Sequence, residues 1–133
     1  MKLAYLDASA VVKLLKPEVE SEALSHALSA WPVRASSELL AVEVRCAARR
    51  LGDADVLERA EITLARISLV ACSEAIQARA GQQFTRRLRA LDAIHAATAV
   101  ALGDALGVVF AYDADLTAAV IGEGIEVAAP APA

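Results

Sequence analysis

Short apolar runs alternate along the chain with longer stretches in which apolar residues recur every three or four positions. The short runs are typical of buried strands, and the longer stretches are typical of helices with one apolar face. Strands that alternate with helices predict a parallel sheet covered by helices on both faces. We therefore expect an α/β fold, a three-layer α/β/α sandwich with a parallel sheet of four to five strands. The expected strands cover residues 2–6, 33–35, 67–71, 108–112 and 125–127.

Turn and capping residues predict where the helices begin and end. Pro17 stops the first helix, and Gly52 follows the last residue of the third. A serine, either Ser36 or Ser37, is expected to begin that third helix. The expected helices cover residues 8–15, 18–30, 36–51, 54–65, 73–87, 91–102 and 113–121.

The length of 133 residues is enough for one domain with a hydrophobic core and too short for two domains of ordinary size. Alanine supplies much of the apolar content, which favours a helix-rich domain over a disordered chain. We assign residues 1–128 to a single domain and residues 129–133, which consist of alanine and proline, to a loose C-terminal tail.

Charge and cysteine usage narrow the class of protein. The net charge of −4 disfavours a passive nucleic-acid binder but leaves room for an enzyme that meets phosphate through metal ions. Cys46 and Cys72 have no cysteine or histidine companions at ligand spacing, so we expect two reduced thiols. Asp7 interrupts any leader-like apolar segment, and no uncharged apolar run approaches ~18 residues. We expect no signal peptide, no membrane span and a cytoplasmic protein.

Several carboxylates stand where a solvated surface residue is not expected. Asp7 ends the first strand, and Asp113 ends the fourth, with Asp115 two residues further on. Ligands of parallel sheets bind beyond the carboxyl ends of the strands, so these side chains converge if the two strands are neighbours. Glu43 and Asp92 stand among apolar residues of two helices. Each acid alone has a simpler explanation, such as a helix cap, and Asp7 is the hardest to explain in that way.

A cluster of these acids is energetically costly. If four carboxylates lie ~5 Å apart at an effective dielectric of ~20, each pair repels by roughly 3 kcal/mol, an upper bound that protonation relieves. The repulsion of the six pairs together approaches ~20 kcal/mol. This exceeds the ~5–15 kcal/mol of free energy that stabilises a typical domain. Such a cluster must hold protons or cations, and oxygen ligands without a cysteine or histidine set favour Mg²⁺ or Mn²⁺.

The order of these acids resembles that of the PIN-domain nucleases, and it is most similar to the VapC toxins of bacterial toxin–antitoxin pairs. The resemblance covers residues 2–127, so the expected single domain is a PIN-like nuclease domain. Four segments carry the resemblance: LDASA at 6–10, LAVEV at 40–44, LDAIHAATA at 91–99 and YDADL at 112–116.

The resemblance implies an Mg²⁺-dependent endoribonuclease toxin, with Mn²⁺ as an alternative ion. It assigns the metal ion to four aspartates, and it gives Glu43 the role of orienting water or helping to bind a second ion. The implied metal ligands are Asp7, Asp92, Asp113 and Asp115. Ser9 matches a small hydroxyl residue that supports the first acid, whereas Ala111 replaces a Thr or Ser that the family often has. The choice between the last two acids as principal ligand stays open. The catalytic acids implied are Asp7, Glu43, Asp92, Asp113 and Asp115.

Arginines near the acids are candidates for binding RNA phosphates, although each also suits a solvated helix face. His95 lies one helical turn after Asp92 and suits a core or supporting role better than direct contact with substrate or an ion. The candidate RNA-binding residues are Arg86, Arg87, Arg89 and Arg45.

The resemblance also implies a cognate VapB-type antitoxin and a homodimer. Helices 18–30 and 54–65 carry enough apolar residues to form a groove for a partner segment. A haloacid-dehalogenase-type phosphatase is disfavoured because Ser9 stands where its second Asp is needed, and a receiver domain because no lysine lies near the last strands. The remaining alternative is a catalytically silent PIN-like module that binds RNA or protein. Nothing in the sequence indicates which RNA is cut.

Overall fold

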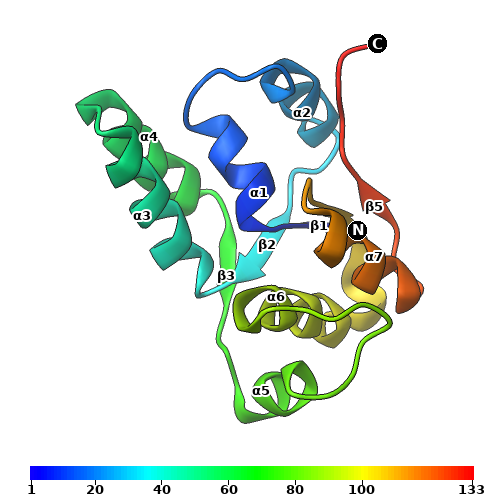
Figure 1. Ribbon diagram of the computed structural model, residues 1–133. Helices are drawn as coiled ribbons and strands as arrows, with labels where there is room; N and C mark the ends of the chain where they lie inside the picture. The colour runs from blue at the N-terminus through cyan, green and yellow to red at the C-terminus, as the bar shows by residue number, and fades with distance from the viewer.

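Five short strands form one parallel sheet in the computed structural model, which describes residues 1–133. The order of the strands across the sheet is β3-β2-β1-β4-β5, and every neighbouring pair is parallel (Figure 1). This arrangement confirms the predicted α/β class and the number of strands. The strands are β1 (Leu3–Leu6), β2 (Arg34–Ser37), β3 (Ser68–Val70), β4 (Leu106–Phe110) and β5 (Val127–Ala128).

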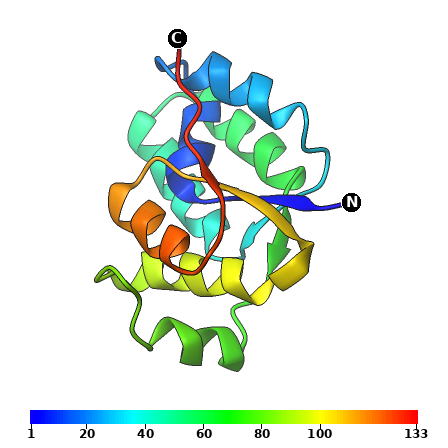
Figure 2. The same cartoon turned by 90° about the vertical axis from the view of Figure 1, so that its right-hand side faces the viewer.

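Helices cover both faces of this sheet, as the alternating pattern predicts (Figure 2). Ala4 and Leu6 pack into a core shared with α1–α4, whereas Tyr5 packs into a second core shared with α5–α7. Successive residues of a strand point to opposite faces, so this alternation defines the three layers. The helices are α1 (Ala8–Val11), α2 (Ser21–Leu28), α3 (Leu40–Leu51), α4 (Ala54–Ala65), α5 (Glu74–Ala80), α6 (Ala90–Ala101) and α7 (Ala114–Gly122), with 3₁₀ turns at Val12–Leu14 and Gly103–Ala105.

The start of α3 differs from the sequence prediction. Ser36 and Ser37 belong to β2 and do not cap a helix, and α3 begins only at Leu40. The Ser36 hydroxyl donates to the carbonyl of Leu6 at 2.6 Å, so its polarity is satisfied inside the sheet. The end of α3 is as predicted, because Gly52 takes a left-handed conformation there with φ of 76°.

The predicted helix over residues 73–87 is correct only in its first half. α5 ends at Ala80, and residues 81–89 run without helical structure to the start of α6. Arg79 anchors this segment, since its guanidinium lies over the ring of Phe84 and donates to Glu123 of α7 at 2.7 Å. Contacts with another element therefore override the local helical pattern.

β1 lies at the point where the strand order reverses. The chain builds outward from β1 to β2 and β3, then crosses to the other side of β1 to form β4 and β5. The carboxyl ends of β1 and β4 are therefore adjacent, which is where parallel α/β sheets bind ligands. No helix of the structure has the length and apolar character needed to cross a membrane.

Residues 129–133 follow β5 without regular structure. The carbonyl of Pro130 accepts a hydrogen bond of 2.6 Å from the Tyr112 hydroxyl, which ties this tail to the loop after β4.

Candidate active site

Asp7 is a buried carboxylate at the end of β1, with 3% of its surface exposed. It caps α1: its Oδ1 accepts from the Ala10 amide at 3.2 Å and from the Ser9 hydroxyl at 2.6 Å. Burial raises the pKa of Asp7 to about 6, although the hydrogen bond from Ser9 opposes the rise. Both side-chain hydrogen bonds go to Oδ1, so Oδ2 has no protein donor.

Ser9 connects the ends of the two central strands. Its hydroxyl donates to Asp7 and accepts from the backbone N–H of Tyr112, the residue before Asp113, at 2.8 Å. Ala111, where the sequence suggested a missing hydroxyl, is fully buried in the core on the α5–α7 side. Ser9 therefore supplies a hydroxyl link between the loops that carry the first and last acids.

Three of the predicted acids line one hollow of about 600 Å³ beyond β4, which we call the acidic hollow. Burial raises the pKa of Asp92, and the negative charges of Asp113, Glu43 and Asp115 raise it further. Asp92 therefore lies within electrostatic reach of three carboxylates from two other segments, one on α3 and one at the start of α7. The residues that line the acidic hollow are Arg87, Leu88, Arg89, Asp92, Asp113 and Asp115.

The last two acids have different surroundings. Asp113 caps α7, and its Oδ1 accepts from the Leu116 amide at 2.9 Å. Asp115 is more than half exposed and forms an ion pair of 3.0 Å with Arg86. Asp115 is thus already paired with a cation from the protein, whereas Asp113 has no basic partner.

Glu43 approaches the site from α3, and its negative charge contributes to the raised pKa of both Asp7 and Asp92 after the larger effect of burial. Its Oε1 lies 2.6 Å from Nε2 of His95, and Nδ1 of that ring lies 2.6 Å from the hydroxyl of Tyr5. The supporting role expected for His95 agrees with this contact. Tyr5 was missed, although a phenol in an otherwise aliphatic buried strand needs a polar partner.

Two of the four arginines expected to bind RNA line the acidic hollow, namely Arg87 and Arg89. Arg86 lies beside it and is paired with Asp115. Arg45 lies elsewhere: its guanidinium makes two hydrogen bonds, of 2.9 and 3.0 Å, to Glu61 on α4. Its positive charge is therefore directed to a neighbouring helix rather than to the acids.

The donor set of the site suits a divalent cation. As they stand, no three Asp, Glu, His or Cys side chains are grouped closely enough to hold a metal ion. The acids nevertheless supply hard oxygen ligands, and burial, together with the smaller effect of neighbouring carboxylates, raises the pKa of both Asp7 and Asp92. A bound cation would stabilise the ionised form of both carboxylates and would therefore lower both pKa values.

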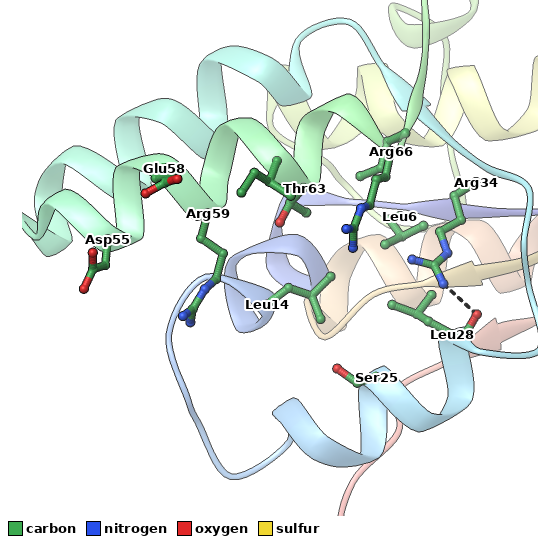
Figure 3. A pocket seen from close by; sticks show the side chains of 12 residues that line it. Leu6, Leu14, Ser25, Leu28, Arg34, Asp55, Glu58, Arg59, Thr63 and Arg66 are labelled. Atoms are coloured by element: carbon green, nitrogen blue, oxygen red, sulfur yellow. Dashed lines mark hydrogen bonds between the residues drawn. The ribbon is translucent and has the colours of Figure 1, made fainter.

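A second feature lies on the α1–α4 face of the sheet. A hollow of about 570 Å³, which we call the two-helix groove, opens between α2 and α4, with Ser25 and Leu28 on one side and Ile62 and Thr63 on the other. Figure 3 shows the side chains of Arg34, Arg59 and Arg66 along it. The groove thus combines apolar side chains with three guanidinium groups. The sequence predicted a groove from the apolar residues of helices 18–30 and 54–65, but it did not predict the arginines.

A parallel sheet with carboxylates gathered where its strand order reverses is the arrangement of a PIN-type nuclease. The family model described as the PIN domain matches residues 4–121, and the chain belongs to this family. Members of the family are metal-dependent nucleases.

Within the family, the relatives are ribonucleases of the VapC type. The chain is 38% identical to ribonuclease VapC46 of Mycobacterium tuberculosis over 130 residues, which cover 98% of this chain and 99% of the relative. It is 34% identical to ribonuclease VapC35 of the same species over 138 residues, with the same coverage of both chains. The recognised family, the enzyme class and the ribonuclease assignment are therefore confirmed.

Solved structures agree on the fold. M. tuberculosis VapC20, a toxin that cleaves the sarcin–ricin loop, superimposes with a TM-score of 0.69 at 21% identity, over 87% of this chain and 94% of that one. A chain of a toxin–antitoxin complex from Klebsiella pneumoniae gives a TM-score of 0.71 at 24% identity, over 96% and 97%.

Proposed function

We propose that this VapC-type ribonuclease hydrolyses RNA phosphodiester bonds at the acidic hollow and depends on Mg²⁺, with Mn²⁺ as an alternative ion. The observation that carries the proposal is that Asp92, Asp113 and Asp115 line one hollow. Burial and the charges of three other carboxylates raise the pKa of Asp92, which supports this grouping. Acids from distant parts of the chain thus share one electrostatic environment, at the edge of the sheet where ligands bind.

Asp7 and Asp92 are the proposed principal metal ligands. Asp113 is the proposed third ligand in preference to Asp115, because Asp115 is paired with Arg86 and Asp113 is the first of the neighbouring charges that raise the pKa of Asp92. A bound Mg²⁺ would supply Lewis acidity, which activates water near neutral pH and stabilises charge on the phosphate.

The protein's own groups hold and orient the reactants. The Ser9 hydroxyl favours the ionised form of Asp7, because its hydrogen bond lowers the pKa against the effect of burial. Glu43 orients the attacking water through the carboxylate oxygen that His95 leaves free. Arg87 and Arg89 grip phosphates of the RNA beside the scissile bond, which offsets the acidic net charge of the protein.

The proposed protein partner is a VapB-type antitoxin with a segment that occupies the two-helix groove. Arg34 and Arg59 donate to backbone carbonyls, whereas Arg66 has no acceptor in the protein and offers its charge to a partner. An apolar segment with acidic residues fits this lining. Ile62→Asp, which places a charge on the apolar wall, is expected to weaken antitoxin binding in calorimetry without reducing RNA cleavage.

A homodimer is also proposed. Large apolar side chains remain on the surface of the single chain, including Val19, Val42, Ile62 and Ile121. Sedimentation at micromolar concentration is expected to give twice the monomer mass of 13.9 kDa. A monomer at every concentration would contradict this part of the proposal.

The experiment that tests the enzyme is cleavage of total cellular RNA by the purified chain, with Mg²⁺ or Mn²⁺ and with EDTA. Cleavage is expected only with the divalent ions, and Asp92→Asn is expected to reduce it to the EDTA background. Asp104→Asn is the matched control, since Asp104 lies in the 3₁₀ turn before β4, away from the acidic hollow. RNA binding without cleavage would support the silent module instead.

A further inference from the structure

A chain of buried hydrogen bonds ends at Glu43 and joins three elements of the fold. Tyr5 of β1 is fully buried, and its hydroxyl lies 2.6 Å from Nδ1 of His95 on α6. His95 is 2% exposed, and its Nε2 lies 2.6 Å from Oε1 of Glu43 on α3. The two rings meet edge to face at 78°. Only the outer end of this hydrogen-bond chain reaches solvent, since the Glu43 side chain is 18% exposed.

A neutral His95 ring with its proton on Nε2 gives each contact of this hydrogen-bond chain one donor and one acceptor. The backbone N–H of Ser37 donates to the Tyr5 oxygen at 3.2 Å, so the phenolic proton is free to point toward Nδ1 of His95. Burial raises the pKa of Tyr5, which keeps the phenol protonated and able to donate. Nδ1 is then an acceptor, the ring proton lies on Nε2, and Nε2–H donates to Glu43.

This arrangement does more than satisfy a core histidine. A buried imidazole needs a donor and an acceptor, and backbone carbonyls would serve as acceptors without involving another helix. Here the acceptor is a carboxylate whose charge acts on Asp7 and Asp92. The single bond to Oε1 restrains the carboxylate and leaves Oε2 without a protein donor.

From this geometry, and resting on the proposed function, we propose that Tyr5 and His95 are positioning residues. They hold Glu43 so that its second oxygen serves the substrate water. Tyr5 acts at a distance, because its hydroxyl decides which nitrogen of His95 carries the proton. Without that hydroxyl the proton can move to Nδ1, and the Nε2 lone pair would then repel Glu43.

The kinetic signature of such a role is a loss in kcat with an unchanged KM, since RNA binding does not use these groups. Tyr5→Phe and His95→Leu are each expected to lower kcat about 10- to 100-fold, the usual effect of removing a partner that orients a functional ligand. His95→Gln is expected to keep more activity than His95→Leu, because an amide can accept from Tyr5 and donate to Glu43. Ser29→Ala is the control, because it also removes one hydroxyl, which in the wild-type protein bonds only to the His26 carbonyl on α2.

A double-mutant cycle separates positioning from general damage to the core. If His95 acts through Glu43, His95→Leu is expected to have no further effect on kcat in a Glu43→Ala background. If it only stabilises the fold, the two losses multiply. Multiplied losses, or full kcat in Tyr5→Phe, would overturn the proposal.

A spectroscopic readout tests the hydrogen-bond chain without RNA. The sequence holds two histidines, and His26→Gln leaves the ring of His95 as the only imidazole signal. Long-range ¹H–¹⁵N NMR is expected to place the ring proton on Nε2 in this variant, and to give a different pattern when Tyr5→Phe is added. A proton on Nδ1 with Tyr5 intact would overturn the proposal. Wild-type protein that fails to cut RNA would instead overturn the proposed function, while the ring proton would still report on the hydrogen-bond chain.

Discussion

At the scale of one residue, the burial of Asp7 lowers the free energy of unfolding at neutral pH. The carboxylate is almost completely buried in the folded protein, and its pKa is about 6 against an ordinary value of 3.8. Between these two values the folded state binds more protons than the unfolded state. Stability is therefore highest below pH 4 as far as this group is concerned, and it falls as the pH rises through 6.

The first prediction concerns Asp7→Asn in the absence of divalent ions. Wild-type protein is expected to lose up to about 3 kcal/mol of unfolding free energy from this group between pH 4 and pH 7. Asp7→Asn is expected to lose less, because the amide carries no charge and can still accept from Ser9 and Ala10. Urea unfolding in EDTA at a series of pH values measures the difference. Parallel pH profiles for the two proteins would contradict the account of burial.

The second prediction concerns Ser9→Ala. The Ser9 hydroxyl bonds to Asp7 and lowers its pKa, so its removal raises that pKa further. Less Asp7 is then ionised near neutral pH, and the acid limb of the RNA-cleavage profile is expected to move to higher pH. Ser29→Ala is the control, since that hydroxyl bonds only to the His26 carbonyl on α2. An unmoved acid limb in Ser9→Ala would count against the hydroxyl link.

At the scale of elements, β4 is fixed by a close approach of Trp31. A methyl group added to Gly107 would lie 2.5 to 2.6 Å from two ring atoms of Trp31, in the turn after α2. Gly107→Ala is the third prediction: it is expected to destabilise the chain by about 1–3 kcal/mol through overpacking. Gly81→Ala is the control, because its added methyl meets only ordinary contacts of 3.6 to 3.7 Å. Chemical denaturation measures both, and equal effects would contradict the packing argument.

Residues 81–89, between α5 and α6, carry the fourth prediction. Arg87→Ala combined with Arg89→Ala is expected to weaken RNA binding and to flatten its dependence on salt by roughly 0.7 in log–log slope for each phosphate that is no longer neutralised. The measurement uses the Asp92→Asn background, so that RNA is bound but not cut. Arg45→Ala is the control, since Glu61 already pairs with that side chain. If the salt slope changes equally in the double variant and in Arg45→Ala, the result would contradict a specific role for Arg87 and Arg89 in RNA binding.

The sequence predicted most helices and strands. It failed where contacts with distant parts of the chain determine the secondary structure. Strand and helix patterns located β1, α4 and α6 to within a residue or two. Ser36 and Ser37 looked like helix caps because their strand partners, β1 and β3, are not visible locally. The segment after α5 kept a helical pattern, yet Arg79 and Phe84 anchor it differently.

At the scale of the whole molecule, the acids come from four separate segments that only the sheet brings together. Their residue types and strand-end positions predicted a shared site, and the pairing of β1 with β4 agrees with the convergence expected for Asp7 and Asp113. The contact of Glu43 with His95 spans 52 residues, and that of Tyr5 with His95 spans 90. No local pattern encodes contacts of that range, so these partners needed the three-dimensional structure.

The central claim is that the gathered carboxylates form one negative site which a divalent cation neutralises. Thermal unfolding at pH 7.5, with saturating Mg²⁺ and with EDTA, tests it most directly. Wild-type protein and Asp104→Asn are expected to gain roughly 3 kcal/mol at about 100 times the dissociation constant, seen as a rise of several degrees in Tm. Asp7→Asn and Asp92→Asn are expected to gain little. No Mg²⁺-dependent rise in wild-type protein, or an equal rise in all four proteins, would contradict the account.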